Sequence, residues 1–147
     1  MSEMIYGLIG RHLTHSYSVP IHNAMGCDTY RLFELEPDEL ATFFKNYEIG
    51  GINVTIPYKL DVAAICDVLS DSAKKVGSVN TVIKDDKGRL CGYNTDLYGL
   101  AYAAKRAGID FAGKKVVVFG SGGASLAAKA VAADGGARQT VIVSRTG

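Results

Sequence analysis

Short apolar runs alternate with amphipathic stretches along the whole chain. The apolar runs are bounded by turn residues, which predicts strands at residues 4–9, 29–35, 51–55, 79–84 and 90–93. The stretches between them open with Ser or Pro and carry apolar faces, which predicts helices at residues 18–25, 37–47 and 57–65. Strands and helices that take turns are typical of an α/β fold with a mostly parallel sheet covered on both faces, a three-layer α/β/α arrangement.

The second half of the chain continues this alternation. Turn residues at 85–88 join the two preceding strands into a hairpin, and an alanine-rich helix is expected at 96–107. We then expect a buried strand at 115–119, a helix at 123–133 and a strand at 140–143. We place a domain boundary within the alanine-rich helix. Residues 1–100 form a complete domain in this interpretation, and residues 101–147 begin a second one with a single β-α-β unit.

The composition of the chain argues against several classes of protein. The chain has 147 residues, 48% hydrophobic and 21% charged, which is typical of a globular protein rather than a disordered one. Sixteen basic against 15 acidic residues give a net charge of +1, which argues against nucleic acid as the main ligand. No apolar run could cross a membrane, and the N-terminus lacks a signal-peptide pattern, so we expect a cytoplasmic protein. Three cysteines, an odd number, favour free thiols over a disulfide framework.

A glycine-rich turn follows the strand at 115–119. The segment Gly120-Ser-Gly-Gly-Ala-Ser125 lies between that strand and the next predicted helix. Glycines there allow a tight turn and a close approach of the backbone to a phosphate, and the helix N-terminus attracts the anion. The pattern therefore predicts an incomplete Rossmann-type unit that binds a dinucleotide pyrophosphate, with a plain strand-to-helix turn as the alternative.

The end of the next strand bears on the choice of dinucleotide. An NAD site carries an acidic residue there, but this chain has Ser144-Arg145-Thr146. An arginine suits the 2′-phosphate of NADP, so we expect NADP as the cofactor. The alternative is a solvated surface arginine.

Small polar residues stand two apart near the ends of predicted strands. The pairs are Ser16/Ser18, Asn53/Thr55 and Asn94/Asp96. Residues at i and i+2 of an extended chain point to the same side, and the carboxyl ends of strands form the ligand crevice of α/β sheets. Together the pairs suit a small polyol, although each could instead cap a helix.

Lys59 and the three histidines are further candidates. With Pro57 as the first helical residue, Lys59 takes the third position, where the helix dipole disfavours a cation. This placement suits a role in proton transfer, and an ordinary surface lysine stays open as the alternative. His12, His15 and His22 lack the helical spacing of a metal-binding pair, so we expect no metal site.

Taken together, these residues resemble shikimate dehydrogenases. The matching motifs are His15-Ser-Tyr-Ser18 with Ile21-His-Asn23, Asn53-Val-Thr-Ile-Pro-Tyr-Lys59, Gly77-Ser-Val-Asn-Thr81, Gly92-Tyr-Asn-Thr-Asp96, Gly120-Ser-Gly-Gly-Ala-Ser125 and Ser144-Arg-Thr146. The resemblance runs from residue 5 to residue 147, about half of the family's usual length. It implies reversible, NADP-dependent reduction of 3-dehydroshikimate to shikimate, a step of aromatic amino-acid biosynthesis.

The resemblance also implies roles for individual residues. Lys59 and Asp96 would be the catalytic proton-transfer pair. The substrate carboxylate would bind Ser16 and Ser18, and the ring hydroxyls would contact Asn53, Thr55, Asn80 and Asp96. The cofactor pyrophosphate would bind Gly120, Ser121, Gly122, Gly123 and Ala124, the 2′-phosphate would bind Ser144, Arg145 and Thr146, and Asp71 would lie near the cofactor.

The chain departs from the family pattern in its first loop, where Gly10-Arg-His12 replaces Gly-x-Pro. That change alters the loop presenting Ser16 and Ser18, so the acid substrate could be quinate as well as shikimate. Two other interpretations stay open: a quinate/shikimate dehydrogenase that prefers NAD, and a truncated, non-catalytic module that binds shikimate. The sequence leaves the oligomeric state open, a homodimer included.

Overall fold

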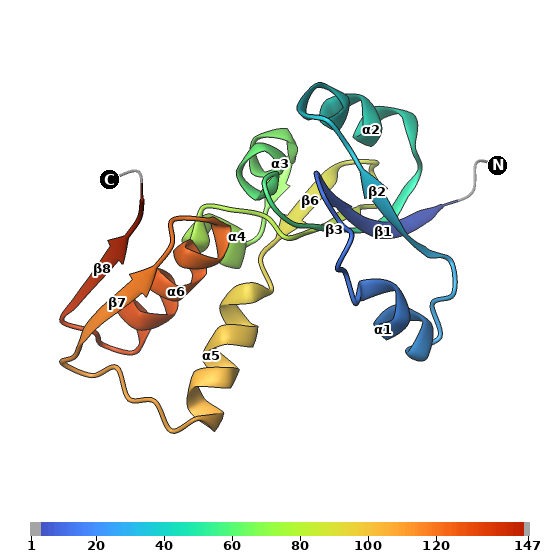
Figure 1. Ribbon diagram of the computed structural model, residues 1–147. Coiled ribbons are helices and arrows are strands. Elements are labelled where there is room, and N and C mark those ends of the chain that lie inside the picture. The colour runs from blue at the N-terminus through green and yellow to red at the C-terminus, as the bar shows by residue number, and fades with distance from the viewer. Residues whose placement is uncertain (1–3, 146–147) are drawn as a thin grey trace.

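The computed structural model describes residues 4–145, which fold around two separate sheets (Figure 1). The strands are β1 (Ile5–Gly10), β2 (Tyr30–Glu34), β3 (Ile49–Val54), β4 (Val68–Leu69), β5 (Thr81–Lys84), β6 (Leu90–Tyr93), β7 (Lys115–Phe119) and β8 (Gln139–Val143). The helices are α1 (Ser18–Ala24), the 3₁₀ turn η1 (Pro37–Glu39), α2 (Leu40–Asn46), α3 (Lys59–Ile65), α4 (Asp71–Val76), α5 (Asp96–Arg106) and α6 (Gly123–Asp134). The predicted strands and helices are all present, with ends that differ by a few residues.

The larger sheet has six strands in the order β2-β1-β3-β5-β6-β4. β1 pairs in parallel with β2 and β3, and β4 pairs in parallel with β6. β5 is antiparallel to both of its neighbours, so it alone runs against the other five strands. The sheet is thus mostly parallel, and the predicted hairpin of β5 and β6 is the exception within it.

Helices cover both faces of this sheet, which confirms the three-layer arrangement. Ile9 of β1 lies in a core with α2 and α3, which contribute Phe43 and Val62. Its neighbour Leu8 points to the opposite face and packs with Tyr30, beside which Val19 of α1 lies. The alternation of side chains along a strand divides these apolar residues between two layers of helices.

Two elements differ from the sequence prediction. Residues 56–58 form a turn that contains a cis Ile56–Pro57 peptide bond, and α3 begins at Lys59. The prediction that Pro57 opens the helix, with Lys59 in third place, is therefore wrong, because the chain turns once more before the helix starts. β4 and α4 were not predicted at all.

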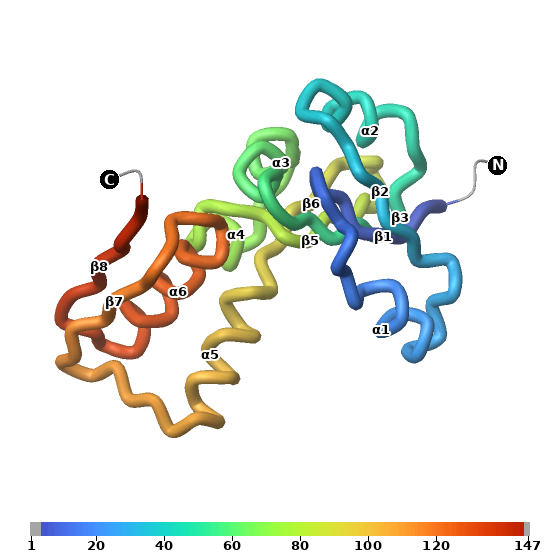
Figure 2. The backbone as a smooth tube through the Cα atoms, viewed as in Figure 1, coloured from blue at the N-terminus to red at the C-terminus, as the bar shows by residue number. Residues whose placement is uncertain are grey.

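The second sheet belongs to a parallel β-α-β unit made of β7, α6 and β8. Figure 2 shows the path of the chain from α5 through β7 into α6, which returns toward α4. Ala127, Ala130 and Val131 of α6 pack against Val76 and Leu97 of the first part. α5 is one continuous helix across the domain boundary placed after residue 100, and that boundary stays a prediction.

Gly7 provides a test of the packing at the centre of the sheet. A methyl group at Gly7 would overlap the Arg31 carbonyl oxygen and lie 2.5 Å from Phe33 Cε2. Gly7→Ala should therefore lower the free energy of unfolding, measured by urea denaturation, by about 1–3 kcal/mol. Gly99→Ala is the matched control, because Gly99 lies in α5 with open space around it and its replacement should raise stability by about 0.5–1 kcal/mol. Equal stabilities of the two variants would contradict this account.

Candidate active site

A polar cavity of about 440 Å³ opens at the ends of β1 and β3. It is lined by Leu8, His12, Leu13, Thr14, His15, Ser16, Ser18, Asn53, Val54, Thr55, Lys59, Asn80 and Asp96. The structure thus brings together every residue that the family resemblance assigned to the substrate, although these residues come from widely separated parts of the chain. We call this space the polar cavity.

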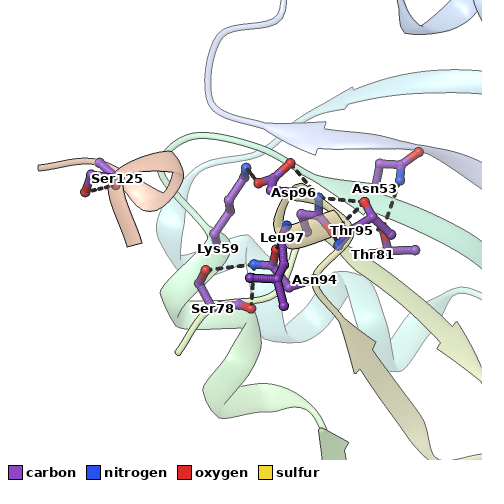
Figure 3. A network of polar contacts seen from close by, with 11 residues as sticks. Asn53, Lys59, Ser78, Thr81, Asn94, Thr95, Asp96, Leu97 and Ser125 are labelled. Carbon is purple, nitrogen blue, oxygen red and sulfur yellow. Dashed lines mark hydrogen bonds and ion pairs between the residues drawn. The ribbon is translucent and has the colours of Figure 1, made fainter. Parts of the chain in front are cut away.

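Lys59 and Asp96 form an ion pair in the polar cavity, with 2.6 Å between Lys59 Nζ and Asp96 Oδ2 (Figure 3). Each is the first residue of its helix, α3 or α5, so two helix N-termini converge here. Helix dipoles stabilise a carboxylate at such a position and destabilise an ammonium group. Asp96 is therefore stable where it lies, whereas Lys59 depends on Asp96 as a counter-ion.

Asn80 holds the other oxygen of the Asp96 carboxylate. Its Nδ2 donates to Asp96 Oδ1 at 2.9 Å and to Thr95 Oγ1 at 2.9 Å. Its Oδ1 accepts the backbone N–H of Thr95 at 2.9 Å, and because a backbone N–H can only donate, the orientation of the amide is fixed. Lys59 and Asn80 together give Asp96 one orientation in the cavity.

The two serines of the first loop lie close together. The backbone N–H of Ser18 donates to Ser16 Oγ at 3.2 Å, and both side chains line the polar cavity. His12 and His15 line it beside them. From the sequence, neither of these histidines was assigned to the substrate site. The spacing of His15 one residue before Ser16 could have signalled its place at the cavity.

Asn94 does not accompany Asp96 into the polar cavity. Its side chain is fully buried, where Nδ2 donates to the Ser78 carbonyl at 3.0 Å and Oδ1 accepts the backbone N–H of Leu97 at 3.3 Å. The expectation that residues 94 and 96 point to the same side is wrong, because the chain leaves the extended conformation after Tyr93 and turns into α5. Asn94 anchors the start of the helix that carries Asp96.

The glycine-rich turn forms a second concave site, the glycine-loop hollow, of about 510 Å³. It is lined by Phe119, Gly120, Ser121, Gly122, Val143, Ser144 and Arg145. Gly120 has a φ of +102°, which favours glycine, and space for a further group is open at both Gly120 and Gly122. The 12-residue helix α6 begins directly behind this turn. An open backbone turn, a helix N-terminus and Arg145 are the features that a phosphate-bearing ligand requires.

Three described residues that were predicted to bind the cofactor do not line this hollow. Gly123 instead faces Lys59, whose Cδ would lie 3.0 Å from a methyl group added there. Ala124 lines a separate space between α5 and α6 that also borders Asp96. Asp71 is exposed at the start of α4 and lines neither the polar cavity nor the hollow. Thr146 lies outside the residues that the structure describes.

Other kinds of site have no counterpart in residues 4–145. In that part of the chain, no helix is both long and apolar enough to span a membrane. Nor do three His, Cys, Asp or Glu side chains come together there in a group suited to a metal ion.

Comparison with known proteins gives one matching family and several similar proteins. Residues 8–82 match the family described as the shikimate dehydrogenase substrate binding domain. The chain is 41% identical over 148 residues to the shikimate dehydrogenase (NADP(+)) of Clostridium beijerinckii, an alignment that covers 95% of this chain and 54% of that protein. The chain thus spans about half the length of the curated relatives it matches.

Solved structures show the same similarity. Shikimate dehydrogenase 1 from Peptoclostridium difficile superimposes with a TM-score of 0.86 and 32% identity, covering 98% of this chain and 61% of that one. Shikimate 5-dehydrogenase from Thermus thermophilus, solved in complex with NADP(H) and shikimate, superimposes with a TM-score of 0.82 and 30% identity. That match covers 98% of this chain and 57% of the other.

Replacement of Asn94 tests its role as an anchor. Asn94→Ala leaves the buried Ser78 carbonyl and the Leu97 N–H without these partners, so the free energy of unfolding should fall by about 2–3 kcal/mol in urea denaturation. Asn46→Ala, at the exposed end of α2, is the control and should change stability by less than about 0.5 kcal/mol. A similar small change at both positions would contradict the assignment.

Proposed function

The chain belongs to the shikimate dehydrogenase family, and we propose that it forms the substrate-binding part of an enzyme that reversibly reduces 3-dehydroshikimate to shikimate with NADP. The observation that carries the proposal is the Lys59–Asp96 ion pair inside the polar cavity. The pair would supply a proton donor and its counter-ion among hydroxyl and amide groups suited to a small polyol acid. The activity proposed is that of a whole enzyme, of which these residues form about half.

Substrate recognition would divide between two sides of the polar cavity. The Ser16 and Ser18 hydroxyls would donate to the carboxylate, with His12 and His15 beside them. Amide and hydroxyl groups on the other side would bind the ring hydroxyls, together with the Asp96 carboxylate; the residues are Asn53, Thr55, Asn80 and Asp96. This division supports an acid that carries its carboxylate at one end and its hydroxyls at the other.

Lys59 would act as the proton donor of the reduction. Its ammonium group would donate a proton to the substrate carbonyl oxygen as that oxygen gains negative charge, and in the reverse direction its amine would take the proton back. Asp96 would orient the ammonium group through the 2.6 Å contact. Bound NADPH would supply the hydride, and the chain's own contribution is to hold the substrate and the proton donor in place.

The glycine-loop hollow supports NADP as the partner of this cavity. Gly120, Ser121 and Gly122 would hold the pyrophosphate, and Ser144 and Arg145 would hold the 2′-phosphate. The start of α6 lies close to both sites, because a Cβ added at Gly123 would approach the Lys59 side chain to 3.0 Å. Gly123, Ala124 and Asp71 remain proposed cofactor residues with less support, since none of them lines the hollow, and Thr146, outside the described residues, remains proposed as well.

The change in melting temperature on addition of a ligand tests whether the chain binds the proposed substrate. Shikimate at about 100 times its dissociation constant should stabilise the chain by roughly 2.7 kcal/mol, a rise of several degrees in Tm. Lys59→Met and Asp96→Asn should each abolish most of that rise. Lys75→Met is the matched control, because Lys75 forms an ion pair of the same length with Asp134 outside the polar cavity.

Three outcomes of this experiment are informative. A rise in Tm with quinate but not with shikimate would identify quinate as the substrate in place of shikimate. A rise that survives both cavity substitutions would place the ligand elsewhere. No rise with either acid would contradict the proposal that this chain binds the substrate.

The choice of dinucleotide can be tested separately with NADPH and NADH, whose fluorescence reports binding. The chain should bind NADPH more tightly, and Arg145→Gln should reduce the ratio of the two affinities by about tenfold or more, since a charge-assisted hydrogen bond is lost. Arg138→Gln removes an exposed arginine at the opposite end of β8 and should leave the ratio unchanged. Tighter binding of NADH by the unaltered chain would favour an NAD-preferring quinate/shikimate dehydrogenase.

A further inference from the structure

Tyr30 lies beneath the polar cavity and contacts residues that line it. The residue is in β2 and only 4% exposed. Its hydroxyl donates to Asn53 Oδ1 at 2.7 Å. The His22 ring stacks on the Tyr30 ring with 3.7 Å between centroids and 6° between planes. A single buried phenol therefore supports the amide side of the polar cavity through Asn53.

The donor and the acceptor of each hydrogen bond can be assigned in turn from Thr95 to Tyr30. Asn80 Oδ1 accepts from the Thr95 backbone, so it also accepts the Thr81 hydroxyl, 3.1 Å away. The Thr81 hydroxyl hydrogen is thereby used, and Thr81 Oγ1 must act as acceptor toward Asn53 Nδ2 at 3.3 Å (Figure 3). Asn53 therefore turns its Oδ1 toward Tyr30, whose hydroxyl must donate.

This order of donors determines what Asn53 offers to a ligand. One hydrogen of its Nδ2 is directed to Thr81 and its Oδ1 accepts from Tyr30, so the second amide hydrogen remains for the polar cavity. Without the Tyr30 hydroxyl, the amide would lose the partner that holds its oxygen in place. The remaining bond to Thr81 engages only the nitrogen and would leave that oxygen unsupported.

We propose that Tyr30 is a positioning residue that fixes the Asn53 amide as a hydrogen-bond donor to the substrate. The inference rests on the proposed function, because it assigns Asn53 to the substrate's ring hydroxyls. Tyr30 itself does not line the polar cavity and acts through Asn53.

Two features of Tyr30 suit it to this role. Burial raises the pKa of its hydroxyl to about 12, so the group stays protonated and can donate at any pH at which the fold is normally studied. The stacked His22 ring and the surrounding Leu8 and Leu13 limit the positions that the tyrosine ring can take. A donor that neither ionises nor rotates is what a fixed amide orientation requires.

The test combines a binding measurement with an NMR measurement on the same variants. Tyr30→Phe keeps the ring and removes the hydroxyl, and it should weaken shikimate binding about three- to tenfold in calorimetric titration. In the Asn53→Ala background the same substitution should change the dissociation constant by less than about twofold, because the group that Tyr30 positions is absent. Tyr58→Phe is the matched control: Tyr58 is equally buried, but its hydroxyl donates to the Leu35 carbonyl.

The NMR arm needs no ligand. In ¹⁵N-labelled protein, the Asn53 side-chain amide resonances should shift or broaden in Tyr30→Phe and stay unchanged in Tyr58→Phe. Unchanged Asn53 resonances in Tyr30→Phe would overturn the inference, as would an equal loss of affinity in both backgrounds. If the unaltered chain fails to bind shikimate, the proposed function falls, and the Asn53 resonances still decide whether Tyr30 positions this amide.

Discussion

The ion pair between Lys59 and Asp96 is the interaction on which the polar cavity depends. It joins the first residues of α3 and α5, two helices that approach the same point from different parts of the chain. An ammonium group that is largely removed from water and placed at a helix N-terminus needs a compensating charge. Asp96 supplies that charge, and Asn80 satisfies the second carboxylate oxygen, so both helices and the strand β5 after Asn80 are fixed relative to one another.

The hydrogen bonds around this pair form one directed network rather than independent contacts. A buried polar network is stable when every member has a partner, and a single unpaired group in it is costly. No buried side-chain nitrogen or oxygen in residues 4–145 lacks a partner. The consequence is that the cavity presents a defined set of donors before any ligand arrives, which lowers the cost of ordering side chains on binding.

Much of this architecture could be predicted from local patterns, and its exceptions have physical causes. Strands such as β7 and helices such as α5 were recognised because apolar runs and glycine or proline residues mark their ends. β4 has only two residues and carries no detectable pattern. The start of α3 was misplaced because proline is compatible with both a helix start and a preceding turn. The β-α-β unit was expected from its glycine-rich turn, but its packing through α6 depends on contacts distant in sequence.

The site residues, too, could be predicted only in part from local sequence patterns. Their gathering in one cavity follows from the sheet, because residues after neighbouring strands meet at one edge. Local spacing cannot show which of two nearby polar side chains enters the cavity. Asp96 lines the cavity, for example, whereas Asn94 is buried outside it. Gly123 is a related case: it belongs to a motif typical of phosphate binding, yet the side chain that it faces is the aliphatic part of Lys59. The same glycine thus belongs to a motif typical of nucleotide binding and also faces the Lys59 side chain, so a comparison of motifs alone would miss its second neighbour.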